Sequence, residues 1–367
     1  MEPNQKVLVC GASFAGLTTA YRMKEMGYEV TVIEVAGHLK PGGTPVDIKD
    51  ETVGIMERMG LLDKLKAQRI SPEKWEFKNA DDVSGHTVLL GEPPENEFEI
   101  ERDVLLHMLF DLVKDTATFI FNNTVVTLDE NGDGIKVRFR DGTEHLFQFV
   151  FGCDGVHSAV RNIWFGEETR YARFPGPYFC IAVAERLLIE EGTYQWYAEP
   201  DKSLSMYAYH NKTDIIFIFR PQKEIPYDFR NREQMKEIVN AQMQGVGWRA
   251  AELTEELLNS GSFYFDRFCQ INMPSWTKGR VALVGDAGYC ASPAAGMGGS
   301  LAIIGADALA DAFEKNRHDF QQAFQMYNRD LRPFVEEVQA RALLMLEKLL
   351  PATQEEIERR HKNGFEF

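Results

Sequence analysis

A glycine-rich turn near the start of the chain constrains the fold more than any other feature. The apolar residues 7–10 precede Gly11-Ala-Ser-Phe-Ala-Gly16, and good helix formers follow over residues 17–26, before Gly27. Residues 28–34 are rich in β-branched side chains and end on an acid. This order predicts a strand, a helix and a second strand. Because the helix is a crossover connection, we expect the two strands to be parallel.

The turn has the composition of a dinucleotide-binding site. Gly11 permits a tight turn, and Gly16 lets the helix pack closely on the strand. Ser13 takes the place of the second small residue, where the backbone approaches a pyrophosphate at the helix N-terminus. Glu34, at the end of the second strand, can accept a hydrogen bond from a ribose hydroxyl. The same pattern also suits an ordinary tight entry into a helix, so it is weak by itself.

Composition excludes several classes of protein. The 367 residues carry 40 Lys+Arg against 56 Asp+Glu, a formal net charge of -16 that would repel nucleic acid. The five cysteines lie far apart without metal-ligand spacing, which predicts a cytoplasmic protein with no metal site. No apolar stretch reaches the ~20 residues that span a membrane. We therefore expect a folded protein of two or three domains that does not bind nucleic acid and does not span a membrane.

Two further motifs place a carboxylate directly after a strand. The first is Gly152-Cys-Asp154-Gly155. The second begins with Gly285-Asp286 and continues to Pro293-Ala-Ala-Gly296-Met-Gly298. Asp286 can accept hydrogen bonds from hydroxyl groups, and the glycine-rich stretch leads to a helix N-terminus that favours negative charge. The alternative for these glycines is an ordinary helix entry.

With three ordered motifs, the sequence resembles the FAD-dependent aromatic hydroxylases, the group A flavin monooxygenases of the p-hydroxybenzoate hydroxylase type. The resemblance extends from Lys6 to about Glu336. Within that superfamily the chain is most similar to the branch of tetracycline-inactivating monooxygenases. The resemblance implies FAD as the cofactor and NAD(P)H and O₂ as co-substrates.

The resemblance also implies roles for particular residues. Asp154 would touch both flavin and nicotinamide, Asp286 would bind the ribityl chain, and Pro293, Gly296 and Gly298 would face the flavin. Arg102 matches an arginine that contacts the flavin, and Asp47 matches a residue of a segment that approaches the cofactor. Lys40 resembles a basic residue used for the NADPH phosphate. The alternatives are a surface ion pair for Arg102, a helix N-cap for Asp47 and a solvated side chain for Lys40.

The chain departs from the family pattern in its third motif. Gly298-Gly299-Ser300-Leu301-Ala302 and Gly305-Ala306 lack an Asn and an Asp that many members carry. Ser13 likewise replaces the usual glycine. These departures leave open whether Ser13, Ser300 and Gly305 alter flavin binding.

The expected fold class is α/β, with a Rossmann-like FAD-binding domain, a β-sheet-rich substrate domain and a C-terminal helix. Aromatic and β-branched residues are dense over residues 174–219, as in an antiparallel sheet with one covered face. We assign 1–69, 98–173 and 270–315 to a discontinuous FAD-binding domain and 70–97 and 174–269 to the substrate-binding domain. Residues 316–367 form a C-terminal helical segment, expected to be interrupted at Pro333.

The substrate is expected between the flavin and the aromatic face of the second domain. The candidate contacts there are Tyr207, Tyr209, His210, Phe217, Phe219 and Arg220. Alternating aromatics in a strand are more often core residues, and Arg220 also suits a strand-end ion pair.

The activity implied by the resemblance is hydroxylation of an aromatic or polyketide-like small molecule, including tetracycline-type compounds, through a flavin C4a-hydroperoxide. The flavin carries the chemistry, so no catalytic side chain is assigned. The alternatives are a flavin-dependent reductase or desaturase of the same fold, or a flavin-binding sensor without turnover. The substrate, the choice of NADPH over NADH and the oligomeric state are not predicted.

Overall fold

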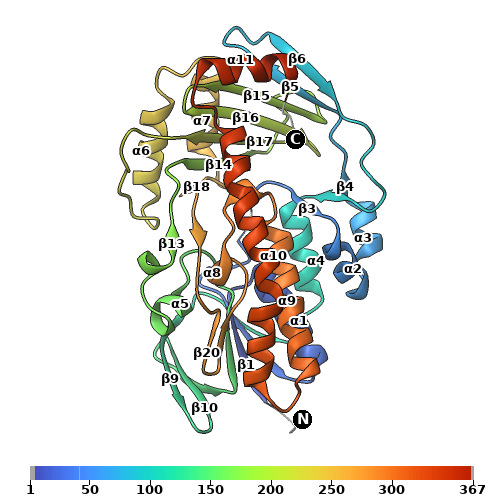
Figure 1. Ribbon diagram of the computed structural model, residues 1–367, viewed down its shortest axis with the longest axis vertical. Coiled ribbons are helices and arrows are strands. Elements are labelled where there is room, and N and C mark those ends of the chain that lie inside the picture. Colours follow the sequence, from blue (N-terminus) through green and yellow to red (C-terminus); the bar gives the residue numbers. More distant parts are fainter. Residues whose placement is uncertain (1–4, 41, 365–367) are drawn as a thin grey trace.

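The fold has two sheet-containing parts joined by long helices (Figure 1). A computed structural model describes residues 5–40 and 42–364. At one end lies a six-stranded sheet of order β20-β21-β12-β1-β2-β8, and at the other a seven-stranded sheet of order β18-β14-β17-β16-β15-β5-β6. The expected α/β class, with a Rossmann-like part, a β-rich part and a C-terminal helix, is confirmed.

The N-terminal unit forms as expected from its residues. Strand β1 (Lys6–Cys10), helix α1 (Phe14–Glu25) and strand β2 (Glu29–Ile33) form a parallel βαβ unit, with Lys6 opposite Glu29 and Cys10 opposite Ile33. Three more parallel strands and one antiparallel strand complete the sheet: β8 (Thr118–Ile120), β12 (Phe149–Gly152), β21 (Val281–Leu283) and β20 (Thr277–Lys278). The strands that precede Gly11, Cys153 and Val284 are therefore neighbours, which brings the three motifs to one sheet edge.

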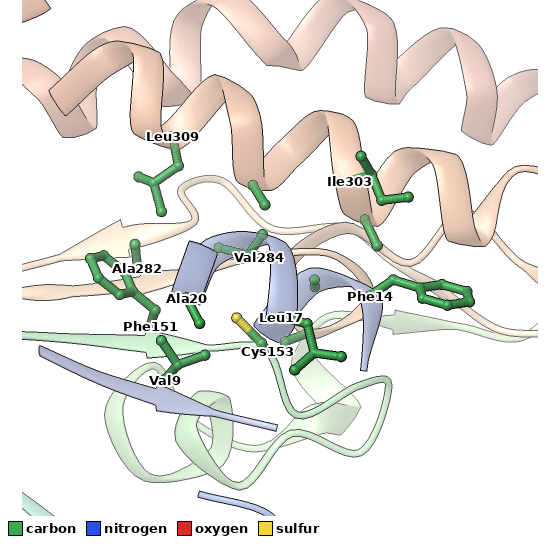
Figure 2. Packing of buried hydrophobic residues seen from close by; sticks show 14 of the residues in the cluster. Val9, Phe14, Leu17, Ala20, Phe151, Cys153, Ala282, Val284, Ile303 and Leu309 are labelled. Carbon is green, nitrogen blue, oxygen red and sulfur yellow. The ribbon is translucent and has the colours of Figure 1, made fainter. Parts of the chain in front are cut away.

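Helices cover this sheet and bury its apolar face. Figure 2 shows α1 between the strands and α9 (Gly298–Lys315), with Leu17 and Ala20 of α1 facing Val9 of β1. The long helix α10 (Phe320–Leu349) packs on α9 and extends from the six-stranded sheet toward the seven-stranded one (Figure 1). One continuous core results, to which β1, β2, β12, β21, α1, α9 and α10 all contribute buried apolar side chains.

The seven-stranded sheet is mostly antiparallel. Its strands are β5 (Lys74–Lys78), β6 (Ser84–Leu89), β14 (Tyr178–Ala184), β15 (Thr193–Glu199), β16 (Lys202–Tyr209), β17 (Lys212–Phe219) and β18 (Tyr264–Arg267). Helices α6 (Arg232–Met243) and α7 (Ala250–Asn259) cover one face, where Met235 and Leu253 pack on the sheet. All seven strands fall within 70–97 and 174–269, which we retain as the proposed limits of the substrate-binding domain.

Smaller elements complete the fold. The strands are β3 (Val46–Ile48), β4 (Arg69–Ile70), β7 (Phe98–Ile100), β9 (Val125–Asn131), β10 (Gly134–Phe139), β11 (Glu144–Phe147), β13 (Ala172–Arg173) and β19 (Gln270–Ile271). The helices are α2 (Glu51–Arg58), α3 (Leu62–Ala67), α4 (Arg102–Asp111), α5 (Ala159–Trp164) and α8 (Asp286–Tyr289). Among these, β3, β7 and α4 lie between the two large sheets, and β3 and α4 carry the expected site residues Asp47 and Arg102.

The expected interruption at Pro333 is wrong. Helix α10 continues through Pro333, and the chain leaves the helical conformation only at residues 350–353, before α11 (Gln354–Asn363). Buried Leu331 and Val335 hold the helix against the core on both sides of the proline. Packing of this apolar stripe therefore outweighs the cost of about 3 kcal/mol for a proline inside a helix. In the described part of the chain, no helix combines the length and apolar character needed to cross a membrane.

Candidate functional site

The glycine turn leaves the N-terminus of α1 without a side-chain cap. Ser13 is the N-cap residue, but its hydroxyl makes no capping hydrogen bond. Gly11 has φ +109°, and a Cβ on Gly11 would lie 2.4 Å from the carbonyl oxygen of Cys153. A Cβ on Gly16 would lie 1.8 Å from the carbonyl oxygen of Gly11. The turn is therefore tight enough to need both glycines, and its free amides suit an anionic group.

The Glu34 carboxylate faces this turn. Its Oε2 accepts a hydrogen bond from the Ala12 amide at 2.9 Å, and its Oε1 accepts one from the Ala36 amide at 2.9 Å. Each carboxylate oxygen has a second lone pair that can accept from a ribose hydroxyl. The two amides hold the carboxylate where the dinucleotide pattern requires it.

Arg102 joins the glycine turn to residues 40–43. Its guanidinium donates to the carbonyl oxygen of Gly42 at 3.0 Å and to the Ser13 hydroxyl at 3.2 Å, and it lies 5.2 Å from the ring centroid of Phe14. Burial lowers the pKa of Arg102. Among the described residues no carboxylate lies within ion-pair distance of Arg102, so the surface ion pair considered for it is wrong. The guanidinium places a positive charge beside the uncapped start of α1.

The two motif aspartates differ in their surroundings. The Asp154 carboxylate accepts from the Ser158 hydroxyl and from the Val160 amide at 3.0 Å, so local contacts hold it at the start of α5. Asp286 begins α8, and burial raises its pKa, although a hydrogen bond from Cys290 and the charge of Arg102 oppose this effect. The Asp286 carboxylate can therefore accept more hydrogen bonds from ligand hydroxyls than the Asp154 carboxylate can.

The glycine-rich loop before α9 borders open space. After the 3-10 turn Pro293–Ala295, Gly296 has φ +64°, and a Cβ on Gly296 or Gly298 would meet no atom within 4 Å. The N-terminus of α9 has no side-chain cap, and the buried Ser292 hydroxyl has no hydrogen-bond partner among the described residues. Open space beside uncapped amides and an unpaired hydroxyl fits a planar ring with polar edges. The residues present thus fit FAD.

Comparisons with known proteins agree with this geometry. The family model described as "FAD binding domain" matches residues 4–342. The chain belongs to this family. A flavin-dependent monooxygenase from an unknown prokaryotic organism is 31% identical over 92% of this chain and 87% of its own length. An uncharacterized protein of Mycobacterium tuberculosis is 32% identical over 96% of each chain. The solved structure of tetracycline destructase Tet(51) covers 98% of this chain and 95% of that chain, with a TM-score of 0.88 and 31% identity.

The resemblance to the flavin monooxygenases, the enzyme class and FAD as cofactor are thereby confirmed. Internal contacts of this monooxygenase account for the two departures in its third motif. The Ser300 hydroxyl donates to the carbonyl oxygen of Asp47 at 2.6 Å and ties β3 to α9. A Cβ on Gly305 would lie 1.8 Å from the Tyr289 hydroxyl oxygen, which is 2.9 Å from the Tyr327 hydroxyl. Gly305 therefore makes room for a tyrosine pair that the sequence analysis missed.

Lys40 and Asp47 lie between the FAD-binding part and the seven-stranded sheet. The Lys40 amine lies 5.1 Å from the ring centroid of Tyr264 on β18, and burial lowers its pKa. Asp47 is opposite Glu99 in the β3–β7 pair, and burial raises its pKa. The N-cap of α2 is Asp50, so the N-cap interpretation of Asp47 is wrong.

Three of the substrate candidates contact carboxylates on the sheet face opposite α6 and α7. The Tyr207 hydroxyl donates to Glu99 at 3.1 Å, and the Tyr209 hydroxyl donates to Asp214 at 2.8 Å. His210 Nδ1 lies 2.6 Å from the Glu101 carboxylate. These side chains face the junction with the FAD-binding part, and their contact with substrate stays a prediction.

The other three candidates lie elsewhere. Phe217 and Phe219 are fully buried beneath α6 and α7, because alternate residues of a strand point to opposite faces. Neither can touch a ligand on the face that carries Tyr207. Arg220 pairs with Asp201 at 2.5 Å at the strand end, so the ion-pair interpretation holds for it.

The accessible residues on the sheet face opposite α6 and α7 were not predicted from the sequence. Ile216, directly before the buried Phe217 in β17, pairs with Ile181 of β14, and both isoleucines are half-buried. Tyr264 lies opposite Ile181 and is 37% exposed. The alternation was visible in the sequence, but which of its two faces the helices cover was not.

Replacing Asp286 with Ala should weaken FAD binding by roughly 1–3 kcal/mol, the value of hydrogen bonds to a charged acceptor. Titration of the FAD-free protein with FAD, followed by the quenching of flavin fluorescence, measures the change. Asp133→Ala, in the exposed turn between β9 and β10, is the control and should leave the affinity unchanged. Wild-type affinity in the Asp286 variant would remove this carboxylate from the FAD site.

Proposed function

We propose that this FAD-dependent monooxygenase uses NAD(P)H and O₂ to hydroxylate an aromatic or polyketide-like small molecule, with a tetracycline-type compound as the first candidate. The open space beside Gly296 and Gly298, directly before the uncapped start of α9, carries this proposal. The likeness to a tetracycline destructase over nearly the whole chain supports the choice of substrate class.

The residues of the site have binding and positioning roles in this proposal. Glu34 and the amides of the glycine turn hold the adenosine side of FAD, Asp286 holds the ribityl chain, and Arg102 and Asp47 contact the flavin. Asp154 is placed near both the flavin and the nicotinamide. When bound and reduced by NAD(P)H, FAD supplies the activation of O₂ and the transfer of one oxygen atom.

In this proposal the protein itself stabilises negative charge and excludes water. The free amides at the start of α9 favour negative charge on the flavin edge that faces Gly296 and Gly298. Half-buried Ile181 and Ile216 provide an apolar surface on the substrate sheet, which limits the access of water to the reacting atoms. Lys40, beside Tyr264, is the proposed contact for the nicotinamide nucleotide phosphate.

Oxygen transfer from O₂ is the decisive test. Incubation of the purified protein with FAD, NADPH and a tetracycline under ¹⁸O₂ should give a product heavier by one labelled oxygen, detected by mass spectrometry. Unlabelled O₂ in H₂¹⁸O is the control and should give no label. Label from water would contradict the proposal, as would NADPH consumption that ends only in hydrogen peroxide across phenolic and polyketide substrates. Those outcomes would favour a reductase or a flavin-binding sensor.

A further inference from the structure

One short segment of the FAD-binding part, residues 99–102, contacts both the substrate sheet and the cofactor loops. Glu99 and Glu101 point toward the seven-stranded sheet, whereas Arg102 points toward the glycine turn. Ile100, between the two glutamates, is fully buried in the core and fixes the segment. The alternation of a strand that runs directly into α4 produces this division.

Glu101 holds the turn between β16 and β17. Its carboxylate lies 2.6 Å from His210 Nδ1 and 2.9 Å from the Lys212 amine. The hydrogen bonds from Lys212 and His210 outweigh burial and hold the pKa of Glu101 below its usual value. His210 and Asn211 both have positive φ, as in a tight two-residue hairpin turn. The contact is therefore a charged connection to the tip of the hairpin.

Glu99 makes a second connection to the same sheet. Its two carboxylate oxygens accept from the hydroxyls of Tyr194 at 2.8 Å and Tyr207 at 3.1 Å. The two tyrosine rings are stacked, with centroids 3.7 Å apart. Burial raises the pKa of Glu99 to about 7, with the hydrogen bond from Tyr194 opposing this effect. Three strands of the substrate sheet, β15, β16 and β17, thus reach the 99–102 segment through side chains.

The side chain of Glu101 is not needed by its own helix. Glu101 is the N-cap residue of α4, yet its carboxylate makes no capping hydrogen bond. Ser, Thr, Asp or Asn in this position would use its side chain to satisfy the first amides of the helix. Here the Glu101 side chain contacts the β16–β17 hairpin instead. The next residue, Arg102, donates the hydrogen bonds to the Ser13 hydroxyl and the Gly42 carbonyl oxygen.

We propose that Glu101 is a positioning residue that places Arg102 against the cofactor, with Glu99 supporting the same segment, so that FAD binding is coupled to the β16–β17 hairpin. The inference rests on the proposed contact between Arg102 and the flavin. It adds a polar connection from the substrate sheet to the cofactor loops, beside the apolar cluster that Ala294 of the third motif forms with Phe179 and Ile218. Glu101 acts through Arg102 and does not itself touch FAD.

FAD affinity of a set of variants tests the coupling. We expect Glu101→Ala to weaken FAD binding about fivefold, the size of a typical interaction energy between neighbouring residues. Glu101→Gln keeps an acceptor oxygen and should recover most of the affinity. Lys212→Met removes a contact from the far side of the connection, without altering α4, and should weaken FAD binding in the same direction. Glu144→Gln, which breaks the exposed Lys136–Glu144 pair on β10 and β11, is the control and should leave affinity unchanged.

A double-mutant cycle separates positioning from general stability. In the Arg102→Leu background, Glu101→Ala should cause no further loss of FAD affinity, because the two residues act through one contact. Full additivity, or wild-type affinity in both Glu101→Ala and Lys212→Met, would overturn the inference. If instead Arg102→Leu binds FAD as tightly as wild type, the proposed flavin contact itself is wrong. The visible absorption of bound flavin, which reports its surroundings, should shift in Glu101→Ala but not in Glu144→Gln.

Discussion

Gly298→Leu should bind FAD much more weakly than wild type while keeping its fold. A Cβ on Gly298 meets no protein atom within 4 Å, and leucine is a good helix former at the start of α9. A side chain here would instead occupy the space proposed for the flavin. We expect FAD affinity to fall roughly ten- to 100-fold, since overpacking costs about 1–3 kcal/mol and each 1.4 kcal/mol is a factor of ten. Flavin fluorescence titration and thermal unfolding of the FAD-free protein measure the two effects.

Gly91→Leu is the matched control for this substitution. Gly91 also has no atom within 4 Å of its Cβ position, but it lies in the loop between β6 and β7. Both its FAD affinity and its unfolding temperature should equal those of wild type. An unchanged affinity in Gly298→Leu would mean that the start of α9 does not face the cofactor, and a large loss of stability would mean that this glycine serves packing.

Gly16→Ala, in contrast to Gly298→Leu, should destabilise the fold itself. Its Cβ would lie 1.8 Å from the Gly11 carbonyl oxygen, a backbone atom that cannot turn away as a flexible side chain can. We expect the FAD-free protein to lose about 3 kcal/mol or more of its free energy of unfolding, measured by denaturant titration. FAD binding should weaken as well, because α1 carries the proposed phosphate site at its N-terminus.

Gly27→Ala is the control in the same βαβ unit. Gly27 has φ +86° and no atom within 4 Å of its Cβ position, so alanine there should cost only about 1–2 kcal/mol of backbone strain. A Gly16→Ala variant no less stable than Gly27→Ala would contradict the close helix–strand packing described for this turn.

Local patterns were sufficient for the parts of the fold that depend on short-range geometry. The βαβ unit was predictable because the tight turn, the crossover helix and the alternating strand all lie within about thirty residues. The family resemblance assigned all three motifs to FAD, and in the structure the parallel strands before them end at the same sheet edge. The interruption expected at Pro333 was wrong because local propensity includes only the cost of a proline inside a helix. Burial of Leu331 and Val335, on either side of the proline, depends on distant elements.

The substrate side could be predicted only in part. The sequence showed alternating aromatics in β16 and β17. In the structure Tyr207 pairs with Asp214, and the period of two within β17 puts Phe217 on the opposite face. Which of those faces α6 and α7 cover depends on helices that follow later in the chain, so Phe217 and Phe219 were placed on the wrong side.

By itself, the sequence determined the FAD-binding architecture and the glycines and carboxylates of its three motifs, because each motif is a local backbone conformation with its own residue requirements. The tertiary structure alone decided what surrounds them. Tyr289 fills the space beside Gly305, and Glu101 reaches a hairpin more than a hundred residues away in the sequence. Such contacts depend on how separate elements pack, and no short-range pattern in the chain encodes the distance between two side chains that only folding brings together.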